Sequence, residues 1–147
     1  MTPEELRLRH LEAIQQVINR LAQNSFTIRG WSVTLASVVF ALLSTQGNTG
    51  RNLVIVSLAP VWIFWGLDAF YLRKERMFRR LYAAQAQALR AGEPPEAPDA
   101  VALFDMNVDP FQVKVASLPR TLLTPHVAAV PATLTVIVLA FWIVGLR

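Results

Sequence analysis

Three long apolar stretches dominate the sequence and restrict what the chain can fold into. They cover residues 31–45, 53–72 and 122–146. An α-helix rises about 1.5 Å per residue, so about 20 apolar residues cross the roughly 30 Å hydrocarbon core of a bilayer. Hydrophobic residues make up 54% of the chain and charged residues 16%, a balance unsuited to a soluble surface. We therefore predict an all-α membrane protein with spans at residues 30–46, 52–72 and 122–146.

The Lys and Arg residues are divided unequally between the two sides that these spans would separate. Of the fourteen, twelve lie before the first span or between the second and third, whereas Arg51 and Arg147 lie on the other side. Short loops rich in Lys and Arg stay in the cytoplasm. The split predicts a multi-pass membrane protein with its N-terminus in the cytoplasm and its C-terminus outside. We expect the basic residues to meet anionic lipid head groups, and no nucleic acid.

Residues 3–29 have the pattern of an amphipathic helix that precedes the first span. Thr2 can cap the helix, Pro3 suits its first position, and Glu5 completes a capping box. Apolar residues then recur at steps of three and four, with glutamines and asparagines on the opposite side. Because that polar side carries few lysines, packing against protein is favoured over anchoring on a lipid surface.

The first two spans are expected to form a hairpin, because residues 46–50 have the composition of a tight turn. One face of the first span carries small and hydroxyl-bearing side chains at steps of three and four: Thr34, Ser37, Ala41 and Ser44. Such a face usually lets helices approach each other closely. The alternative is that it lines a polar path across the membrane.

The second helix is expected to continue beyond the membrane over residues 73–91, since no helix-breaking residue intervenes. Pro60 removes a backbone donor within the second span and predicts a kink there. Residues 92–120 are predicted to form an extended linker followed by an irregular cytoplasmic segment. In the third span, Pro125 is expected near the helix start and Pro131 is expected to kink the helix.

Residues 104–109 alternate apolar side chains with Asp and Asn, which predicts a short extended stretch. Their Asp spacing also opens a calcium loop, but Pro110 stands where glycine is needed and Ala116 where a bidentate glutamate is needed. His10 and His126 are far apart, and the chain has no cysteine. We therefore predict no metal site and no cofactor. Without a phosphate loop, a zinc motif or a nucleophile elbow, an enzyme is not expected.

Asp68 is the only acidic residue within any predicted span, about one and a half turns before Arg73. A carboxylate at that depth is by default a functional hypothesis. The structural alternative is an ion pair with Arg29 at the same depth, which would fix the register of the hairpin, and we favour it. Further along, Glu75 and Arg79 have the four-residue spacing of a helical ion pair.

Three segments resemble proteins of a known kind. Residues 24–35 (NSFTIRGWSVTL) resemble the NSFxx[KR]GWxVTL signature of short, mostly uncharacterised bacterial membrane proteins. Residues 65–76 (WGLDAFYLRKER) resemble their WGLDAYYLRQER segment, and residues 104–111 resemble a third, looser one. The resemblance marks a set of candidate residues at the inner membrane interface: Asn24, Ser25, Arg29, Gly30, Trp31, Asp68, Arg73 and Glu75.

The predicted arrangement is also similar to the SLATT effector domains of bacterial nucleotide-signalled defence systems. Those domains place a cytoplasmic helix before a membrane hairpin and a long cytoplasmic helix after it, and this chain adds a third span. The similarity implies a homo-oligomeric effector that perturbs or permeabilises the membrane, in antiphage defence. Three spans of one chain cannot enclose a water path, so conduction would need several copies.

Two other functions remain open. The chain could be a membrane-anchored scaffold whose helices recruit a cytoplasmic partner protein. It could also be a small transporter component with Asp68 as its proton site. The transporter ranks last, because such sites usually lie nearer the membrane midplane.

Overall fold

The computed structural model describes residues 2–45, 54–92 and 104–144. Helices are the only regular elements within these ranges, which confirms the all-α prediction. Three of them are long and apolar enough to cross a membrane. In chain order the elements are α1 (Pro3–Ser44), η1 (Val54–Ser57), α3 (Leu58–Arg90), η2 (Asp109–Phe111), α4 (Leu118–Leu122) and α5 (Pro125–Val144). The predicted turn at 46–50 and most of the predicted linker lie outside the described residues.

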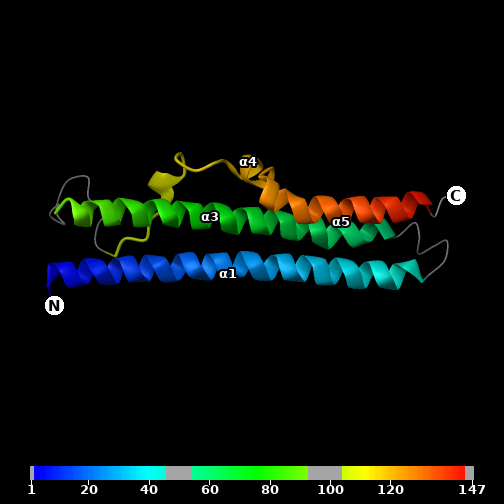
Figure 1. The fold of residues 1–147 in the computed structure, drawn as a ribbon, viewed down its shortest axis with the longest axis horizontal. Coiled ribbons are helices and arrows are strands. Elements are labelled where there is room, and N and C mark those ends of the chain that lie inside the picture. The colour runs from blue at the N-terminus through cyan, green and yellow to red at the C-terminus, as the bar shows by residue number, and fades with distance from the viewer. Residues whose placement is uncertain (1, 46–53, 93–103, 145–147) are drawn as a thin grey trace.

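The molecule is a long antiparallel hairpin of α1 and α3, with the rest of the chain laid along α3 (Figure 1). The helix α5 packs beside the first part of α3, α4 lies beside its middle, and η2 lies beside its second part. We call residues 30–45, 54–72 and 125–144 the apolar half. The polar half comprises residues 2–29, 73–92 and 104–124. Apart from residues 122–124, the described parts of all three predicted spans thus lie in the apolar half.

The helix α1 is continuous over 42 residues and joins the predicted amphipathic helix to the first span. It begins as predicted: the Thr2 hydroxyl accepts the Glu5 backbone N–H at 3.2 Å, and the Glu5 carboxylate accepts the Thr2 backbone N–H at 2.8 Å. Gly30 does not interrupt it, because a lone glycine in a helix lowers stability by only about 1 kcal/mol. The predicted extension of the second helix is also confirmed, since α3 runs to Arg90.

The polar half has an apolar core of its own. It is formed by Ile14 and Ile18 of α1, Met77 and Leu81 of α3, and Val108 and Phe111 of the segment that follows. Burial of each such side chain stabilises the fold by roughly 1.5–3 kcal/mol. The predicted packing of the N-terminal helix against protein is therefore confirmed.

The segment from Phe104 to Ser117 is irregular outside η2, as predicted, but its conformation at 104–109 differs from the prediction. Phe104 has a positive φ of 65° and Val108 has helical angles (φ −102°, ψ 0°), so the predicted extended stretch is wrong. Two Asx-type turns shape the segment, with Asp105 accepting the Asn107 N–H at 2.8 Å and Asn107 accepting the Asp109 N–H at 3.0 Å. These turns bring Val108 and Phe111 into the core.

The prolines mark helix starts more than kinks. Pro60 lies in the first turn of α3, directly after the 3₁₀ turn η1, and not in the middle of a helix. The first four N–H groups of a helix have no intrahelical partner, so the missing donor costs little there. The predicted kink within the second span is thus replaced by a junction between a 3₁₀ helix and an α-helix. Pro125 starts α5 as predicted, and α5 continues through Pro131.

Candidate functional site

The candidate site is centred on the carboxylate of Asp68, which α3 places at the boundary of the apolar half. The Arg29 Nε of α1 donates to Asp68 Oδ2 at 2.7 Å. The Ser25 hydroxyl, one turn earlier on α1, donates to Asp68 Oδ1. The predicted pairing of Asp68 with Arg29 is confirmed. We refer to these three residues as the Asp68 cluster.

The spacing of the α1 residues explains how both reach one carboxylate. Ser25 and Arg29 are four residues apart and so share a face of the helix. The Asp68 side chain is only 4% exposed, whereas that of Arg29 is 34% exposed. A buried carboxylate is tolerated when both of its oxygens have partners. The cluster therefore fixes the register of α1 against α3 while the guanidinium keeps contact with the surroundings.

A cavity of about 10 Å³ lies beside the cluster. Its walls come from all three long helices, with Arg29 and Ser32 of α1, Asp68 of α3 and Val127 of α5 among them. A cavity needs at least about 10–15 Å³ to hold one water molecule. The space beside Asp68 is thus too small for a chain of waters, which weighs against a proton path through a single copy.

The turns of α3 on either side of Asp68 hold the connection to α5. Trp65 Nε1 donates to the Leu122 carbonyl at 3.3 Å, and Arg73 Nε donates to the Ala116 carbonyl at 3.2 Å. Arg73 thus positions the backbone that leads into α4. Its contact is structural, and its location at the membrane interface stays a prediction.

The other candidates from the sequence lie outside the Asp68 cluster. Glu75 is buried and pairs with Arg79, whose Nε lies 2.8 Å from Glu75 Oε1, as predicted. Gly30 and Trp31 are exposed, with Trp31 at 56%, and Asn24 is half-buried on α1. Among the described residues, no group of three or more acidic or histidine side chains could hold a metal ion.

The predicted packing face of the first span is turned outward. Thr34, Ser37 and Ala41 are exposed, and the side chain of Ser44 is not described. The buried small residues of this span are instead Ser32 and Ala36. If the face at 34–41 packs against a helix, that helix belongs to another molecule.

His10 is a buried residue to which the sequence analysis gave no role, beyond its being too far from His126 for a shared metal site. Its side chain is 1% exposed, and Nδ1 accepts the Phe104 backbone N–H at 3.4 Å. The imidazole also lies against the Phe104 ring, with 5.5 Å between centroids. Nε2 is buried and has no hydrogen-bond partner in the described part of the chain. The sequence did indicate the burial of His10, because His10 lies four and eight residues before Ile14 and Ile18 and so shares the buried stripe of α1.

Acidification is expected to weaken the polar half through His10. Burial lowers the pKa of His10 below its ordinary value of 6.5, and the nearby Asp105 opposes this shift. Above pH 6.5 the imidazole is neutral in both folded and unfolded chains. Below that pH the unfolded chain binds a proton that the folded chain resists, so stability falls.

Thermal unfolding followed between pH 7.5 and 5.5 measures this loss. His10→Leu should flatten the pH dependence, whereas His126→Gln, at an exposed histidine, should retain it. An unchanged pH profile in His10→Leu would contradict the assignment.

Comparisons of the chain with protein-family models, with curated proteins and with solved structures gave no match. Three membrane-length helices, the Asp68 cluster and the outward face of α1 are the features on which a function can be based.

Proposed function

We propose that the protein is a homo-oligomeric effector of a bacterial inner membrane that perturbs or permeabilises the membrane. The observation that carries the proposal is the outward face of α1 at Thr34, Ser37 and Ala41. A single copy would turn these small and hydroxyl-bearing side chains toward lipid tails. Small and hydroxyl-bearing residues allow close approach of a second helix and hydrogen bonds to it.

The small cavity within one copy favours a water path that lies between several copies. The cavity beside Asp68 has room for about one water, so it does not hold a chain of waters within one copy. Several copies that meet along the outward face of α1 would place the Thr34 and Ser37 hydroxyls at their common boundary. Such a boundary can be close-packed or, when the copies separate, wetted.

Charge and resemblance support the orientation and the biological setting. The polar half carries the basic residues and is assigned to the cytoplasm by the distribution of Lys and Arg. The Asp68 cluster links the two segments with the most specific resemblance, since Ser25 and Arg29 belong to one and Asp68 to the other. In the SLATT effector domains, which the arrangement of this chain resembles, such a hairpin serves antiphage defence, and we extend that role to this chain.

The assembly is tested by lengthening one side chain on the outward face. Ser37→Leu is expected to weaken self-association in nanodiscs by about tenfold, corresponding to the roughly 1–2 kcal/mol of a polar interhelical contact. Val38→Leu, at an exposed neighbouring position, is the matched control and should assemble normally. Mass photometry gives the oligomeric state, and a potential-sensitive dye reports permeabilisation in cells. A wild-type chain that stays monomeric in lipid and leaves the membrane potential intact would contradict the proposal.

A membrane-anchored scaffold is the second candidate. Its support is apolar surface on the polar half, where Leu8 is 48% exposed and Val113 is 95% exposed. A stable stoichiometric complex with a cytoplasmic protein, without any change in permeability, would favour the scaffold over the effector.

A further inference from the structure

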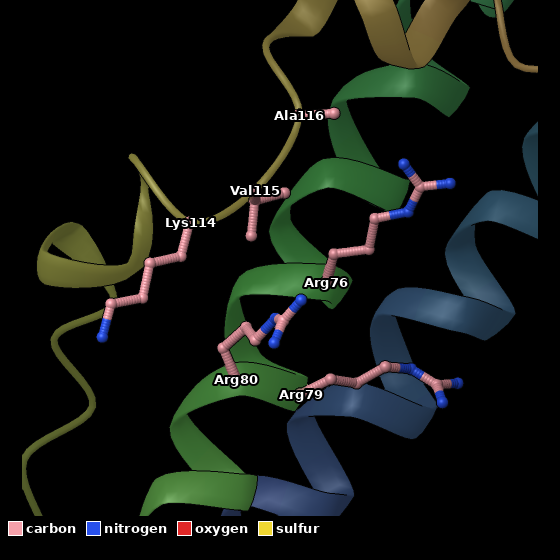
Figure 2. Close-up of a pocket in the computed structure, with 6 residues that line it drawn as sticks. All are labelled: Arg76, Arg79, Arg80, Lys114, Val115 and Ala116. Atoms are coloured by element: carbon pink, nitrogen blue, oxygen red, sulfur yellow. The ribbon is translucent and has the colours of Figure 1, made fainter.

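A basic pocket lies between the second part of α3 and the segment that precedes α4. It has a volume of about 320 Å³, at the small end of the range of about 300–1,000 Å³ for small-molecule sites. One wall is α3, and the other is the backbone at 114–116 (Figure 2). The residues that line it are Arg76, Arg79, Arg80, Lys114, Val115 and Ala116. The described lining thus contains four cations and no acidic residue.

The cations differ in how far they are already neutralised. In Figure 2 the side chains of Arg76 and Arg79 both extend toward the α1 side of α3, and of these two only Arg79 forms an ion pair within the described residues, with 2.7 Å between its Nη2 and Glu75 Oε1. Arg76 and Arg80 are four residues apart on α3, a spacing at which like charges repel. Lys114 adds a third positive charge from the other wall, and its Nζ lies 5.6 Å from the Phe111 ring centroid. A bound anion would offset this repulsion.

Both walls of the pocket are held in place. Phe111, on one side of the 114–116 backbone, is buried in the core of the polar half. On the other side, the Ala116 carbonyl accepts the Arg73 Nε. The Lys114 side chain is exposed and turned outward in Figure 2, so it is free to rotate toward a ligand. An anion between α3 and this backbone would therefore meet fixed backbone walls, and Arg76 and Lys114 would reach it by rotating their side chains.

The position of the pocket relative to the proposed membrane span points to phosphate as the anion. From Val54 to Arg73 the helix rises about 28 Å, close to the thickness of the hydrocarbon core. Arg76 and Arg80 therefore lie about 5–11 Å beyond it, at the level of the lipid phosphates and the water next to them. The guanidinium fork matches phosphate oxygens in shape and charge.

We propose that this pocket binds a phosphate group through Arg76, Arg80 and Lys114, and so clamps the 114–116 segment onto α3. The phosphate belongs either to an anionic phospholipid head group or to a soluble phosphate compound. This site is independent of the proposed effector function, because it concerns the polar half and needs no second copy.

The test compares three proteins in nanodiscs: wild type, Arg76→Gln/Arg80→Gln, and the control Arg9→Gln/Arg20→Gln. The control removes the same charge from exposed positions on α1. Native mass spectrometry measures retained phosphatidylglycerol in mixed phosphatidylcholine–phosphatidylglycerol discs. Thermal unfolding measures the effect of added inorganic phosphate in phosphatidylcholine discs. We expect the pocket variant to lose about tenfold in affinity for one of these probes, and the control to keep the wild-type affinity.

The two measurements separate the sources of the phosphate. Selective retention of phosphatidylglycerol assigns a lipid head group, and stabilisation by inorganic phosphate assigns a soluble ligand. Equal behaviour of all three proteins toward both probes would overturn the proposal. If the double variant does not fold, Lys114→Gln replaces it, because that side chain is exposed, and a loss of about threefold is expected.

Discussion

Replacing Arg29 with glutamine is expected to destabilise the hairpin of α1 and α3 by about 3–5 kcal/mol, because it leaves a carboxylate buried without its cation. The Asp68 side chain is only 4% exposed. The reverse change is expected to be milder. Asp68→Asn leaves Arg29, which is 34% exposed and can hold its charge among lipid head groups, and the new amide oxygen can still accept from Ser25. A loss of about 1–3 kcal/mol is expected there.

The asymmetry between the two variants is the measurable signature of the Asp68 cluster. Unfolding of the purified protein in detergent gives the stability of each single variant and of Arg29→Gln/Asp68→Asn. The double variant should recover much of the Arg29→Gln loss, since two neutral amides can hydrogen-bond to each other. Asp68→Ala should resemble Asp68→Asn with a further loss from the unfilled space. Normal stability and assembly in all of them, together with lost activity, would instead assign Asp68 a direct functional role.

The second large effect is expected at Phe111. Its ring is 8% exposed and closes the core of the polar half, so Phe111→Ala should cost about 3–5 kcal/mol. The loss should be local, because the helices α1 and α3 keep their own contacts at Ile14 and Leu81. Hydrogen exchange should therefore speed up across residues 104–122 more than across the Asp68 cluster.

Val113→Ala is the matched control for Phe111→Ala. Val113 lies two residues away and is 95% exposed, so its truncation should change stability by less than about 0.5 kcal/mol. Protection of residues 104–122 that is equal in the two variants would show that the segment is held by something other than the Phe111 ring.

The parts of the fold that depend on local pattern could be predicted from the sequence. Apolar length gives the spans, the Thr2–Glu5 box gives the start of α1, and the absence of a breaker gives the continuation of α3. The segment at 104–117 could not be predicted, because its conformation depends on contacts with residues far away in the chain. Its apparent alternation pointed to Phe104 and Val108, whereas the buried residues are Val108 and Phe111, three apart.

The candidate site could be predicted only in part, because some of its contacts follow from residue type and position and others depend on how the helices are oriented. Asp68 and Arg29 could be paired from charge and depth, since few other partners exist at that level. The contact of Ser25 with Asp68 needed the exact rotation of α1 about its axis, and only the resemblance marked this residue. The burial of His10 could have been predicted from its place on the stripe of Ile14 and Ile18, but its hydrogen-bond partner could not, because that partner is a backbone N–H 94 residues away.

The helix α1 runs without a break through both halves of the molecule, and the Asp68 cluster contacts it between its two ends. At 1.5 Å per residue, about 39 Å of helix lies between Pro3 and Arg29 and about 22 Å between Arg29 and Ser44. The N-terminal part of α1 is held against α3 by Ile14 and Ile18. A displacement of the start of α1 is therefore expected to strain the Asp68 cluster, because the helix has no break at which it could bend.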